Sequence, residues 1–394
     1  MSDLTISNAV IFDGVSAELA EGSVHIVDGT VAAEPRADAR VFDARGRVVV
    51  PGLIDAHFHA YGMALDLLEI EASPLSYLAL GGARRLARAL RRGFTTVRDV
   101  AGGDAGLAKS IAQGLIESPR YLYSGPALSQ TGGHGDARPT DLDVCICSMA
   151  MVEVVDGVDA VRRAVRDRFR HGAHAIKVMT SGGVMSPTDP IRIPQYSPDE
   201  LRVISAEAQR RGSYVAAHAY SPEAIRHSVE NGIRSIEHGN LLDAETAQLM
   251  ATREAFLVPT LATYDAMRRR REQLGLAAVS RAKNAEVLDG GRQAVELAAR
   301  AGVRIGFGTD LMGDLEDEQL LGLRLQAEVA GMLDTLRSAT SVNAALIGRP
   351  DLGRITPGAV ADLVILDGNP FERQSLLWEG ARTVIQAGRV VAEA

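Results

Sequence analysis

Two histidines stand one residue apart at the end of an apolar run, in the stretch GLIDAHFH that covers residues 52–59. In a β-strand alternate side chains share a face, so His57 and His59 are expected to point the same way, together with Asp55. Two neutral imidazoles on one face can ligate one metal ion. The alternative is two half-buried histidines that bond to backbone groups. The pair alone leaves both interpretations open.

Three later apolar segments also end in residues that bind metals. SYVAAHA carries His218 near its end, RSIEHG carries His238, and VRIGFGTD ends at Asp310. If these segments are strands of one barrel, their C-terminal ends meet at the rim where barrel enzymes place their chemistry. Four histidines and one aspartate at one rim predict a metal site. Imidazole with carboxylate favours Zn²⁺, followed by Co²⁺ or Mn²⁺.

Lys177 lies between apolar residues in the segment AIKVM, in a chain with three lysines. Burial lowers the pKa of an ammonium group, and nearby metal cations lower it further. A neutral amine can add carbon dioxide to form a carbamate, an anionic ligand that can bridge two metal ions. The alternative is a lysine that extends to the rim and pairs with a carboxylate.

Short apolar runs alternate with helical patterns between the two ends of the chain, which is typical of βα units. One helix is predicted from Ser197 to Gly212, with a capping box of Ser197 and Glu200. Eight strand–helix pairs predict a (β/α)₈ TIM barrel within an α/β fold. The strand candidates, in order, are GLIDAHFH, FTTVRDV, RYLYSG, AIKVMTSG, SYVAAHA, RSIEHG, AFLVPTL and VRIGFGTD.

Both ends of the chain read as short strands punctuated by Gly and Asp. We expect them to fold together into one small discontinuous β-sandwich domain. The predicted division is residues 1–52 for its first part, 53–352 for the barrel and 353–394 for its second part.

Composition restricts the partners and the compartment. The net charge of −8 argues against nucleic acid or an acidic membrane surface as a partner. The arginine run 268–271 is expected to be a solvated helix face. Cys145 and Cys147 are too close in sequence to favour a disulfide and indicate a reducing compartment. No apolar run is long enough to span a membrane and no signal core is present, so a cytoplasmic protein is expected.

The motifs PGLIDAHFH, AIKVMTSGG, AAHA, IEHG and GTD, in this order, resemble the amidohydrolase superfamily. The segment GRITPGAVADLVILDGNP resembles that superfamily's return into its β domain. The resemblance implies a barrel that holds a binuclear zinc centre. By position it implies His57 and His59 as first-strand ligands, His218 and His238 as ligands of the second metal ion, and Asp310 as ligand and general base. It also implies a carbamylated Lys177 that bridges the two ions.

A narrower resemblance points to one branch of that superfamily. ALSQTGGHGDARP, KVMTSGGVMSPTDP and HAYSPEAIRHSVENGIRSIEHGN are similar to segments of the zinc-dependent, prolidase-like dipeptidases, whose relatives hydrolyse ochratoxin. That similarity implies His134 and Tyr220 beside the scissile carbonyl and the substrate carboxylate. The alternatives are a loop histidine in a glycine-rich turn and an aromatic residue at the rim.

The expected function is hydrolysis of the amide bond of a dipeptide or an N-acyl amino acid, with aryl amides as a further substrate class. A hydroxide that bridges two metal ions would attack, with Asp310 moving the proton. One alternative is a mononuclear deaminase or cyclic-amide hydrolase similar to imidazolonepropionase, but such enzymes commonly lack the bridging lysine. A non-catalytic scaffold protein is a distant alternative, because all six ligand positions are filled.

The expected partner is a small-molecule substrate, and a homo-oligomer is expected for a chain of this size. A substrate carboxylate needs a cationic partner. The candidates, all expected in loops, are Arg138, Arg192 and Arg324.

Overall fold

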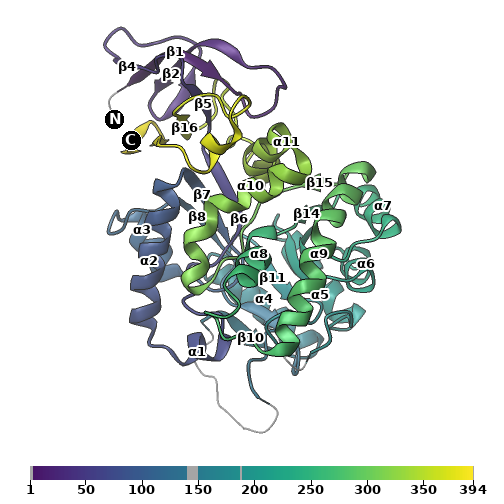
Figure 1. Cartoon of the computed structure of the whole chain (residues 1–394). Coiled ribbons are helices and arrows are strands. Elements are labelled where there is room, and N and C mark those ends of the chain that lie inside the picture. The colour runs from purple at the N-terminus through teal and green to yellow at the C-terminus, as the bar shows by residue number, and fades with distance from the viewer. Residues whose placement is uncertain (1–2, 140–149, 187–188, 394) are drawn as a thin grey trace.

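Parallel strands form the centre of the molecule in the computed structural model, which describes residues 3–139, 150–186 and 189–393 (Figure 1). They pair in the orders β6-β7-β8 and β10-β9-β11-β12-β13-β14-β15. The strands are β6 (Leu53–Phe58), β7 (Phe94–Asp99), β8 (Arg120–Tyr123), β9 (Ala127–Ser129), β10 (Val152–Val154), β11 (Ile176–Met179), β12 (Val215–Ala219), β13 (Ser235–His238), β14 (Phe256–Val258) and β15 (Arg304–Ile305).

Backbone hydrogen bonds also join the two parallel sheets. Ala56 N of β6 donates to Phe307 O just beyond β15 (2.9 Å), and Asp310 N donates to His57 O (2.8 Å). Between β8 of one sheet and β11 of the other, His174 N, just before β11, donates to Tyr123 O (2.7 Å). The arrangement is consistent with the expected TIM barrel, and each of the eight predicted segments contains a strand or leads out of one.

Helices surround the parallel strands (Figure 1). The predicted helix after Ser197 is confirmed as α5, and its capping box of Ser197 and Glu200 forms. The helical elements are α1 (Leu67–Ala72), α2 (Leu75–Arg91), α3 (Ala105–Ala112), α4 (Val158–Arg170), α5 (Pro198–Gln209), α6 (Pro222–Glu230), α7 (Ala244–Thr252), α8 (Leu261–Arg269), α9 (Ala278–Ala301), η1 (Gly313–Glu318), α10 (Gln319–Ala330), α11 (Met332–Arg337), η2 (Ser338–Val342), α12 (Asn343–Leu346) and η3 (Gln374–Leu377).

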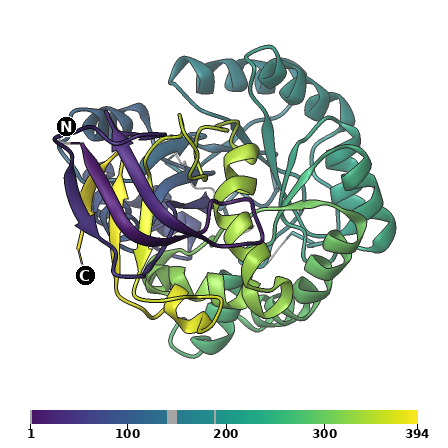
Figure 2. The same ribbon diagram turned by 90° about the horizontal axis from the view of Figure 1, so that it is seen from above.

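The two ends of the chain share one mixed eight-stranded sheet, which lies over one end of the parallel strands (Figures 1 and 2). Strand β1 pairs with β4 through its first half and with β5 through its second half, so the strands from both chain ends belong to one continuous mixed sheet. The strands are β1 (Leu4–Ile11), β2 (Ala20–Val27), β3 (Thr30–Ala32), β4 (Arg40–Asp43), β5 (Val48–Pro51), β16 (Leu363–Leu366), β17 (Arg382–Gln386) and β18 (Arg389–Ala392).

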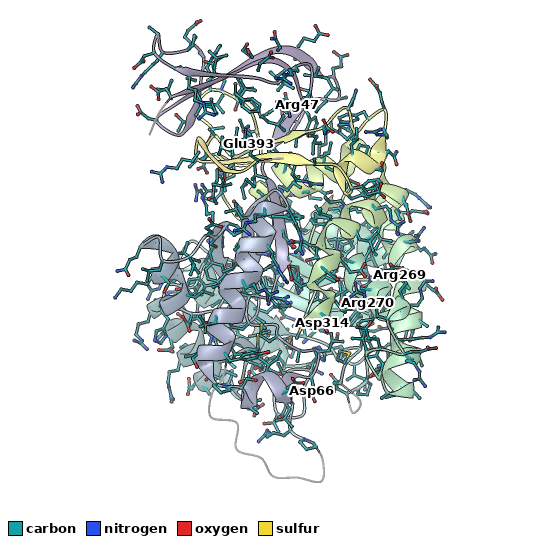
Figure 3. All side chains as sticks on the ribbon, turned by 60° about the vertical axis from the view of Figure 1, so that its left-hand side comes forward. Arg47, Asp66, Arg269, Arg270, Asp314 and Glu393 are labelled. Carbon is teal, nitrogen blue, oxygen red and sulfur yellow. The ribbon has the colours of Figure 1, made fainter. Side chains whose placement is uncertain are left out.

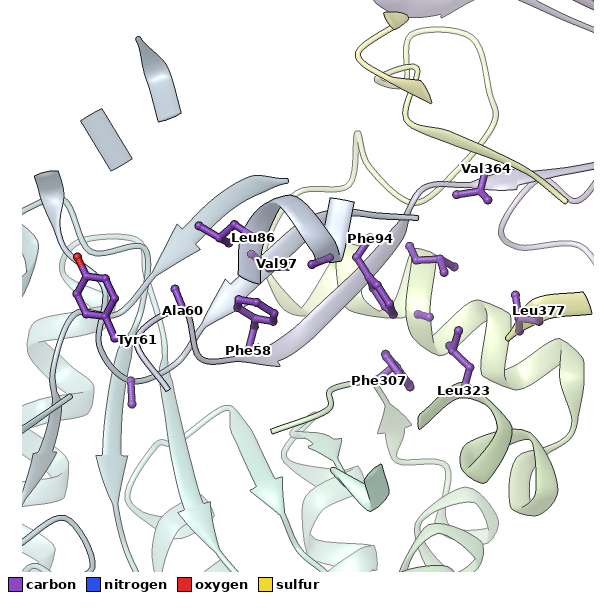
Figure 4. Close-up of a cluster of buried hydrophobic side chains, with 14 of the residues drawn as sticks. Phe58, Ala60, Tyr61, Leu86, Phe94, Val97, Phe307, Leu323, Val364 and Leu377 are labelled. Carbon is purple, nitrogen blue, oxygen red and sulfur yellow. The ribbon is translucent and has the colours of Figure 1, made fainter. Parts of the chain in front are cut away.

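One apolar cluster joins that sheet to the parallel strands (Figure 4). Phe94 of β7 stacks on Phe307 with ring centroids 5.9 Å apart, and Val364 of β16 and Leu377 of η3 pack in the same cluster. Burying each such side chain contributes about 1.5–3 kcal/mol, so this packing holds the sheet from the chain ends against the parallel strands that carry the predicted site.

Three arginines of the run 268–271 form ion pairs at the end of α8 and just beyond it. Arg268 and Arg269 pair with Asp265 at 3.0 and 2.7 Å, and Arg270 pairs with Asp317 at 2.8 Å. Figure 3 labels Arg269 and Arg270. These arginines are bound to carboxylates of the same chain, which agrees with a solvated helix face. Among the described residues no helix is long and apolar enough to cross a membrane. Cys145 and Cys147 lie outside the described residues.

Candidate metal centre

Neighbouring strands bring Lys177 and His218 to one face. Lys177 of β11 pairs in register with Ala216 of β12, and His218 stands two residues further along the same strand. His218 pairs in turn with Glu237 of β13. Because paired residues of parallel strands point to the same side, Lys177, His218 and Glu237 share one face of the sheet.

His238 follows Glu237 directly, so strict alternation would turn its side chain to the opposite face. Its backbone is left-handed instead, with φ 75°, and its ring lies 4.5 Å from that of His218 and 5.0 Å from that of His57. Asp310 (φ 53°) and Thr260 (φ 46°), at the ends of neighbouring strands, are also left-handed. Such residues cost about 1–3 kcal/mol each and gather at functional sites.

The first strand departs from the predicted alternation. Asp55 accepts from Gln319 of α10 (2.9 Å), whereas His57 faces Glu237 of β13 (2.8 Å). A register shift between Asp55 and Phe58 separates the two side chains. The expectation that Asp55 shares a face with the histidines is therefore wrong, because a bulge changes which side each later residue faces.

The carboxylate of Asp310 lies among three of the predicted histidines. Its Oδ1 is 2.9 Å from His59 Nε2 and 3.4 Å from His57 Nε2. One potential ligand atom from each of His57, His238 and Asp310 lies within 4.8 Å of the other two. Burial raises the pKa of Asp310, but the contacts with His57 and His59 outweigh burial and hold this pKa well below its usual value. Asp310 is therefore ionised at neutral pH.

Two hydrogen bonds orient the first-strand imidazoles. His57 Nδ1 bonds to Glu237 Oε2 at 2.8 Å, and His59 Nδ1 bonds to the carbonyl of Ala101 at 3.3 Å. Each bond leaves Nε2 facing Asp310. This is the arrangement in which metal-binding histidines are usually held, with the second nitrogen donating to a carboxylate or carbonyl.

Glu237 is fully buried and forms an ion pair with buried Arg98, whose Nη2 lies 2.8 Å from Oε1 and 2.9 Å from Oε2. Burial raises the pKa of Glu237, yet Arg98 and His57 reverse the shift and hold it well below its usual value. Arg98 Nε also donates to Ala56 O (2.5 Å) in β6. Hydrogen bonds thus connect the ion pair of Arg98 and Glu237 to the imidazole of His57.

Hydroxyl groups support the other side of the centre. His238 Nδ1 lies 2.8 Å from Thr260 Oγ1 and 2.7 Å from the hydroxyl of Tyr264. Burial lowers the pKa of both His218 and His238 well below the usual value. Both imidazoles are therefore neutral, which is the form that binds metal ions.

Lys177 is buried, at 2% exposure. Burial lowers the pKa of its ammonium group to about 8, although the negative charges of Glu237 and Asp310 act in the opposite direction. Among the described residues no hydrogen bond or ion pair engages its amine. The lysine therefore faces the carboxylates of the centre and has no partner at the rim of the kind proposed as the alternative.

His134 and Tyr220 flank His218. The ring of His134 stacks on His218 with centroids 4.2 Å apart, and Tyr220 meets His218 edge-on at 4.9 Å. His134 also lies against Gly183, where a Cβ atom would stand 2.0 Å from Cε1 of the imidazole. The glycine of the loop after β11 therefore makes room for His134 beside the centre.

Two of the three arginine candidates, Arg138 and Arg192, lie in loops as expected, and Arg324 does not. Arg324 lies within α10 and not in a loop, because the preceding turn η1 runs directly into that helix. Arg192 lies in the loop after β11 and pairs with Glu286 (2.5 Å), and Arg138 pairs with Asp136 (2.6 Å).

Sequence reasoning missed four residues that support the predicted ligands, either by direct contact or, for Arg98, through Glu237. Arg98 and Glu237 are charged residues inside segments that are predicted to be buried strands, a signal that is readable in FTTVRDV and RSIEHG. Thr260 and Tyr264 carry no such signal, because they follow a strand in an ordinary polar and aromatic pattern.

The donor set fits a metal centre. Neutral imidazoles, an ionised carboxylate and oriented ring nitrogens are the ligands that Zn²⁺ takes in enzymes. The strained backbone at His238 and Asp310 is also consistent with a built site.

Comparisons with known proteins identify the family of the chain. The amidohydrolase family model matches residues 48–391. Ochratoxinase of Aspergillus niger is 35% identical over 345 residues, which are 82% of this chain and 71% of that protein. A prolidase structure in complex with N-methylphosphonate-L-proline has a TM-score of 0.96 and 41% identity, and the match covers 100% of both chains. A Xaa-Pro dipeptidase with bound methionine in its active site has a TM-score of 0.88 and 28% identity, again over 100% of both chains.

The match spans most of the chain and includes the strands that bring the histidines and Asp310 together. The chain belongs to the amidohydrolase family and is a hydrolase that acts on C–N bonds.

Proposed function

We propose that the protein is a binuclear zinc amidohydrolase that cleaves the amide bond of dipeptides or N-acyl amino acids. The observation that carries the proposal is the meeting of His57, His238 and Asp310 ligand atoms within 4.8 Å. Buried Lys177 on the same face adds the position for a second metal ion. Relatives described as a prolidase, a Xaa-Pro dipeptidase and an ochratoxinase support an amide substrate.

The proposed ligands divide into two sets. His57, His59 and Asp310 would hold one metal ion, and His218 and His238 would hold the other. Lys177, as a carbamate, would bridge the two ions. When bound, the ions would lower the pKa of water and polarise the scissile carbonyl. Zn²⁺ fits the donor set best, with Co²⁺ or Mn²⁺ as substitutes.

Asp310 is the proposed general base. Its carboxylate is ionised and lies against the two first-strand histidines, so it can accept the proton of an attacking water at Oδ1 or Oδ2. The same group can then return the proton to the nitrogen of the leaving amine. No serine or cysteine nucleophile is needed for this sequence of steps.

His134 and Tyr220 are the proposed substrate contacts. Burial raises the pKa of the Tyr220 hydroxyl, so Tyr220 stays a neutral hydrogen-bond donor throughout the working pH range. His134 keeps about a fifth of its side chain exposed, at 18%, and is therefore open to a ligand. Donors of this kind orient a carbonyl or carboxylate and are typically worth about 3 kcal/mol each in the transition state.

The proposed substrate is a small molecule with a free carboxylate. Two relatives hold N-methylphosphonate-L-proline and methionine, and both ligands carry the carboxylate of an amino acid. Xaa-Pro, Xaa-Arg and N-acyl amino acids meet this requirement, as do aryl amides of amino acids. We expect a homo-oligomer in the cytoplasm, without nucleic acid or membrane as partner.

The site would sit on a (β/α)₈ barrel in which β8 and β9 are two parts of one strand. The proposed division is residues 53–352 for the barrel, with residues 1–52 and 353–394 forming the domain built from the chain ends. Under this division every proposed ligand lies in the barrel, and the terminal domain contributes none.

The test combines a metal count with a substrate screen. The purified protein should bind about two zinc ions per chain and hydrolyse at least one class among Xaa-Pro, Xaa-Arg and Xaa-hydrophobic dipeptides, N-acyl amino acids and aryl amides. Asp310→Asn serves as the inactive control. A single metal ion together with hydrolysis or deamination of cyclic substrates alone would overturn the proposal.

A further inference from the structure

The hydroxyl of Tyr264 lies between a proposed metal ligand and a proposed substrate contact. It is 2.7 Å from His238 Nδ1 and 2.7 Å from the hydroxyl of Tyr220. Thr260 Oγ1 lies 2.8 Å from the same nitrogen, His238 Nδ1. His238, Tyr264 and Tyr220 thus form one hydrogen-bonded chain, which we name the tyrosine relay.

The relay is held rigidly. Tyr264 is 1% exposed, lies in α8 and packs in an apolar cluster with Leu311 and Leu315. Its backbone carbonyl accepts from Asn284 Nδ2 at 3.0 Å. The ring of Tyr220 stacks on His238 with centroids 5.0 Å apart and an interplanar angle of 19°. Packing therefore fixes the rings of Tyr220 and Tyr264, and a change to phenylalanine at either position removes only the hydroxyl and its hydrogen bonds.

Each hydroxyl has one proton to donate, and this limits the direction of the relay. When the Nε2 atom of His238 binds a metal ion, Nδ1 carries the remaining ring proton and must donate it. Tyr264 can accept that bond and donate its own proton to the oxygen of Tyr220. The proton of Tyr220 is then free to point toward a substrate oxygen.

We infer that Tyr264 is a positioning residue that couples metal binding at His238 to substrate binding at Tyr220. The inference rests on the proposed function, because it uses His238 as a ligand and Tyr220 as a substrate contact. Loss of either tyrosine hydroxyl interrupts the same chain, so the effects of the two losses on metal affinity overlap.

The experiment measures Zn²⁺ affinity by competition with a chelator, without any substrate. The proteins are the wild type, Tyr264→Phe, Tyr220→Phe and the double variant, which all keep their aromatic rings. Tyr264→Phe should weaken Zn²⁺ binding by about tenfold, the lower end for losing a partner of a metal-binding histidine. Tyr220→Phe should weaken it by a few-fold, and the double variant should match Tyr264→Phe alone.

Tyr123→Phe is the matched control, because Tyr123 is also a buried tyrosine and donates its hydroxyl proton to the carbonyl of His171, away from the centre. It should leave Zn²⁺ affinity unchanged. The visible spectrum of the Co²⁺-substituted protein gives a second readout, and it should change in Tyr264→Phe and in Tyr220→Phe but not in the control.

The outcomes separate the inference from the proposed function. A wild-type protein that binds no Zn²⁺ overturns both. A wild-type protein that binds Zn²⁺, with losses in the two single variants that multiply in the double variant, overturns the relay alone. An unchanged Zn²⁺ affinity and Co²⁺ spectrum in Tyr220→Phe would also overturn it.

Discussion

The two halves of the proposed metal centre are supported by different chemistry. On the side of β6, His57 is backed by the buried carboxylate of Glu237, which is paired with Arg98. On the side of β13, His238 is backed by the hydroxyls of Thr260 and Tyr264. We call these the charged half and the neutral half.

The difference matters because removing a buried charge and removing a buried hydroxyl have different costs in free energy. Removing one member of a buried ion pair leaves the other charge unpaired, which costs about 3–5 kcal/mol. Losing one hydroxyl–imidazole bond costs about 0.5–1.5 kcal/mol. The charged half is therefore tied to the stability of the whole protein, whereas the neutral half can change its fit to a ligand without unfolding.

The largest expected effect comes from the residue that would join the halves. Lys177→Ala removes the proposed bridge, so bound zinc should fall from about two ions per chain and hydrolysis should fall by on the order of 10³-fold or more, given the several kcal/mol that metal ions supply. Metal analysis and the rate of amide hydrolysis measure the change.

Lys109→Ala in α3 is the control, because Lys109 is exposed. The Lys177 variant should keep the circular dichroism of the wild type, since no hydrogen bond or ion pair within the described parts of the chain engages the amine that it removes. Turnover close to the wild-type rate would show that the halves do not need this bridge.

The next largest effect should come from the charged half. Glu237→Gln leaves Arg98 buried without its carboxylate, so the free energy of unfolding should fall by about 3–5 kcal/mol. Zn²⁺ affinity should fall about 10–100-fold, because His57 loses its orienting carboxylate. Denaturant unfolding and chelator competition measure the two losses.

Replacing both members of the pair separates stability from orientation. Arg98→Met with Glu237→Leu removes both charges, and stability should recover by more than half of the loss in Glu237→Gln. Zn²⁺ affinity should stay low. Full recovery of Zn²⁺ affinity would mean that the carboxylate of Glu237 supports folding only and does not orient His57 for metal binding.

The sequence predicts the ligands of both halves but not their supports. His57, His59, His218 and Asp310 stand at or just beyond the ends of apolar segments, and the rule that parallel strands end at one rim brings them together. That inference needs only the order of strands, which hydrophobic patterning and helix caps define well. The contacts of Asp310 with His57 and His59 agree with it.

The charges of Arg98 and Glu237 are visible in the sequence, but which way these side chains and their neighbours face depends on backbone detail that composition does not encode. Glu237 was overlooked because alternation allows either Glu237 or His238 to face inward, and the left-handed backbone at His238 allows both. The bulge in β6 that turns Asp55 away from His57 is equally hidden. A left-handed threonine or aspartate is held in place by its surroundings, so no local pattern signals it.

A smaller effect is expected from pH, which should change the rate of carbamate formation at Lys177, the proposed bridge, by about tenfold. The pKa of Lys177 is lowered to about 8 by burial, so its amine is mostly protonated at pH 7 and mostly neutral at pH 9. Only the neutral amine adds carbon dioxide. At a fixed concentration of dissolved carbon dioxide, the metal-free protein should therefore form the carbamate about tenfold faster at pH 9 than at pH 7. The signal of ¹³C-labelled carbamate follows the reaction, and Lys177→Ala should show none.

The smallest effect should come from the neutral half, at Thr260. Thr260→Ser keeps the hydroxyl beside His238 and removes the methyl group that makes a left-handed backbone costly, so Zn²⁺ affinity should stay within about twofold and stability should rise by up to about 1 kcal/mol. Thr260→Val keeps the branched shape and removes the hydroxyl, so Zn²⁺ affinity should fall a few-fold, as expected for about 1 kcal/mol. Chelator competition and thermal unfolding distinguish the two variants. If valine and serine gave equal affinities, the hydroxyl would have no part in holding His238, and the neutral half would rest on Tyr264 alone.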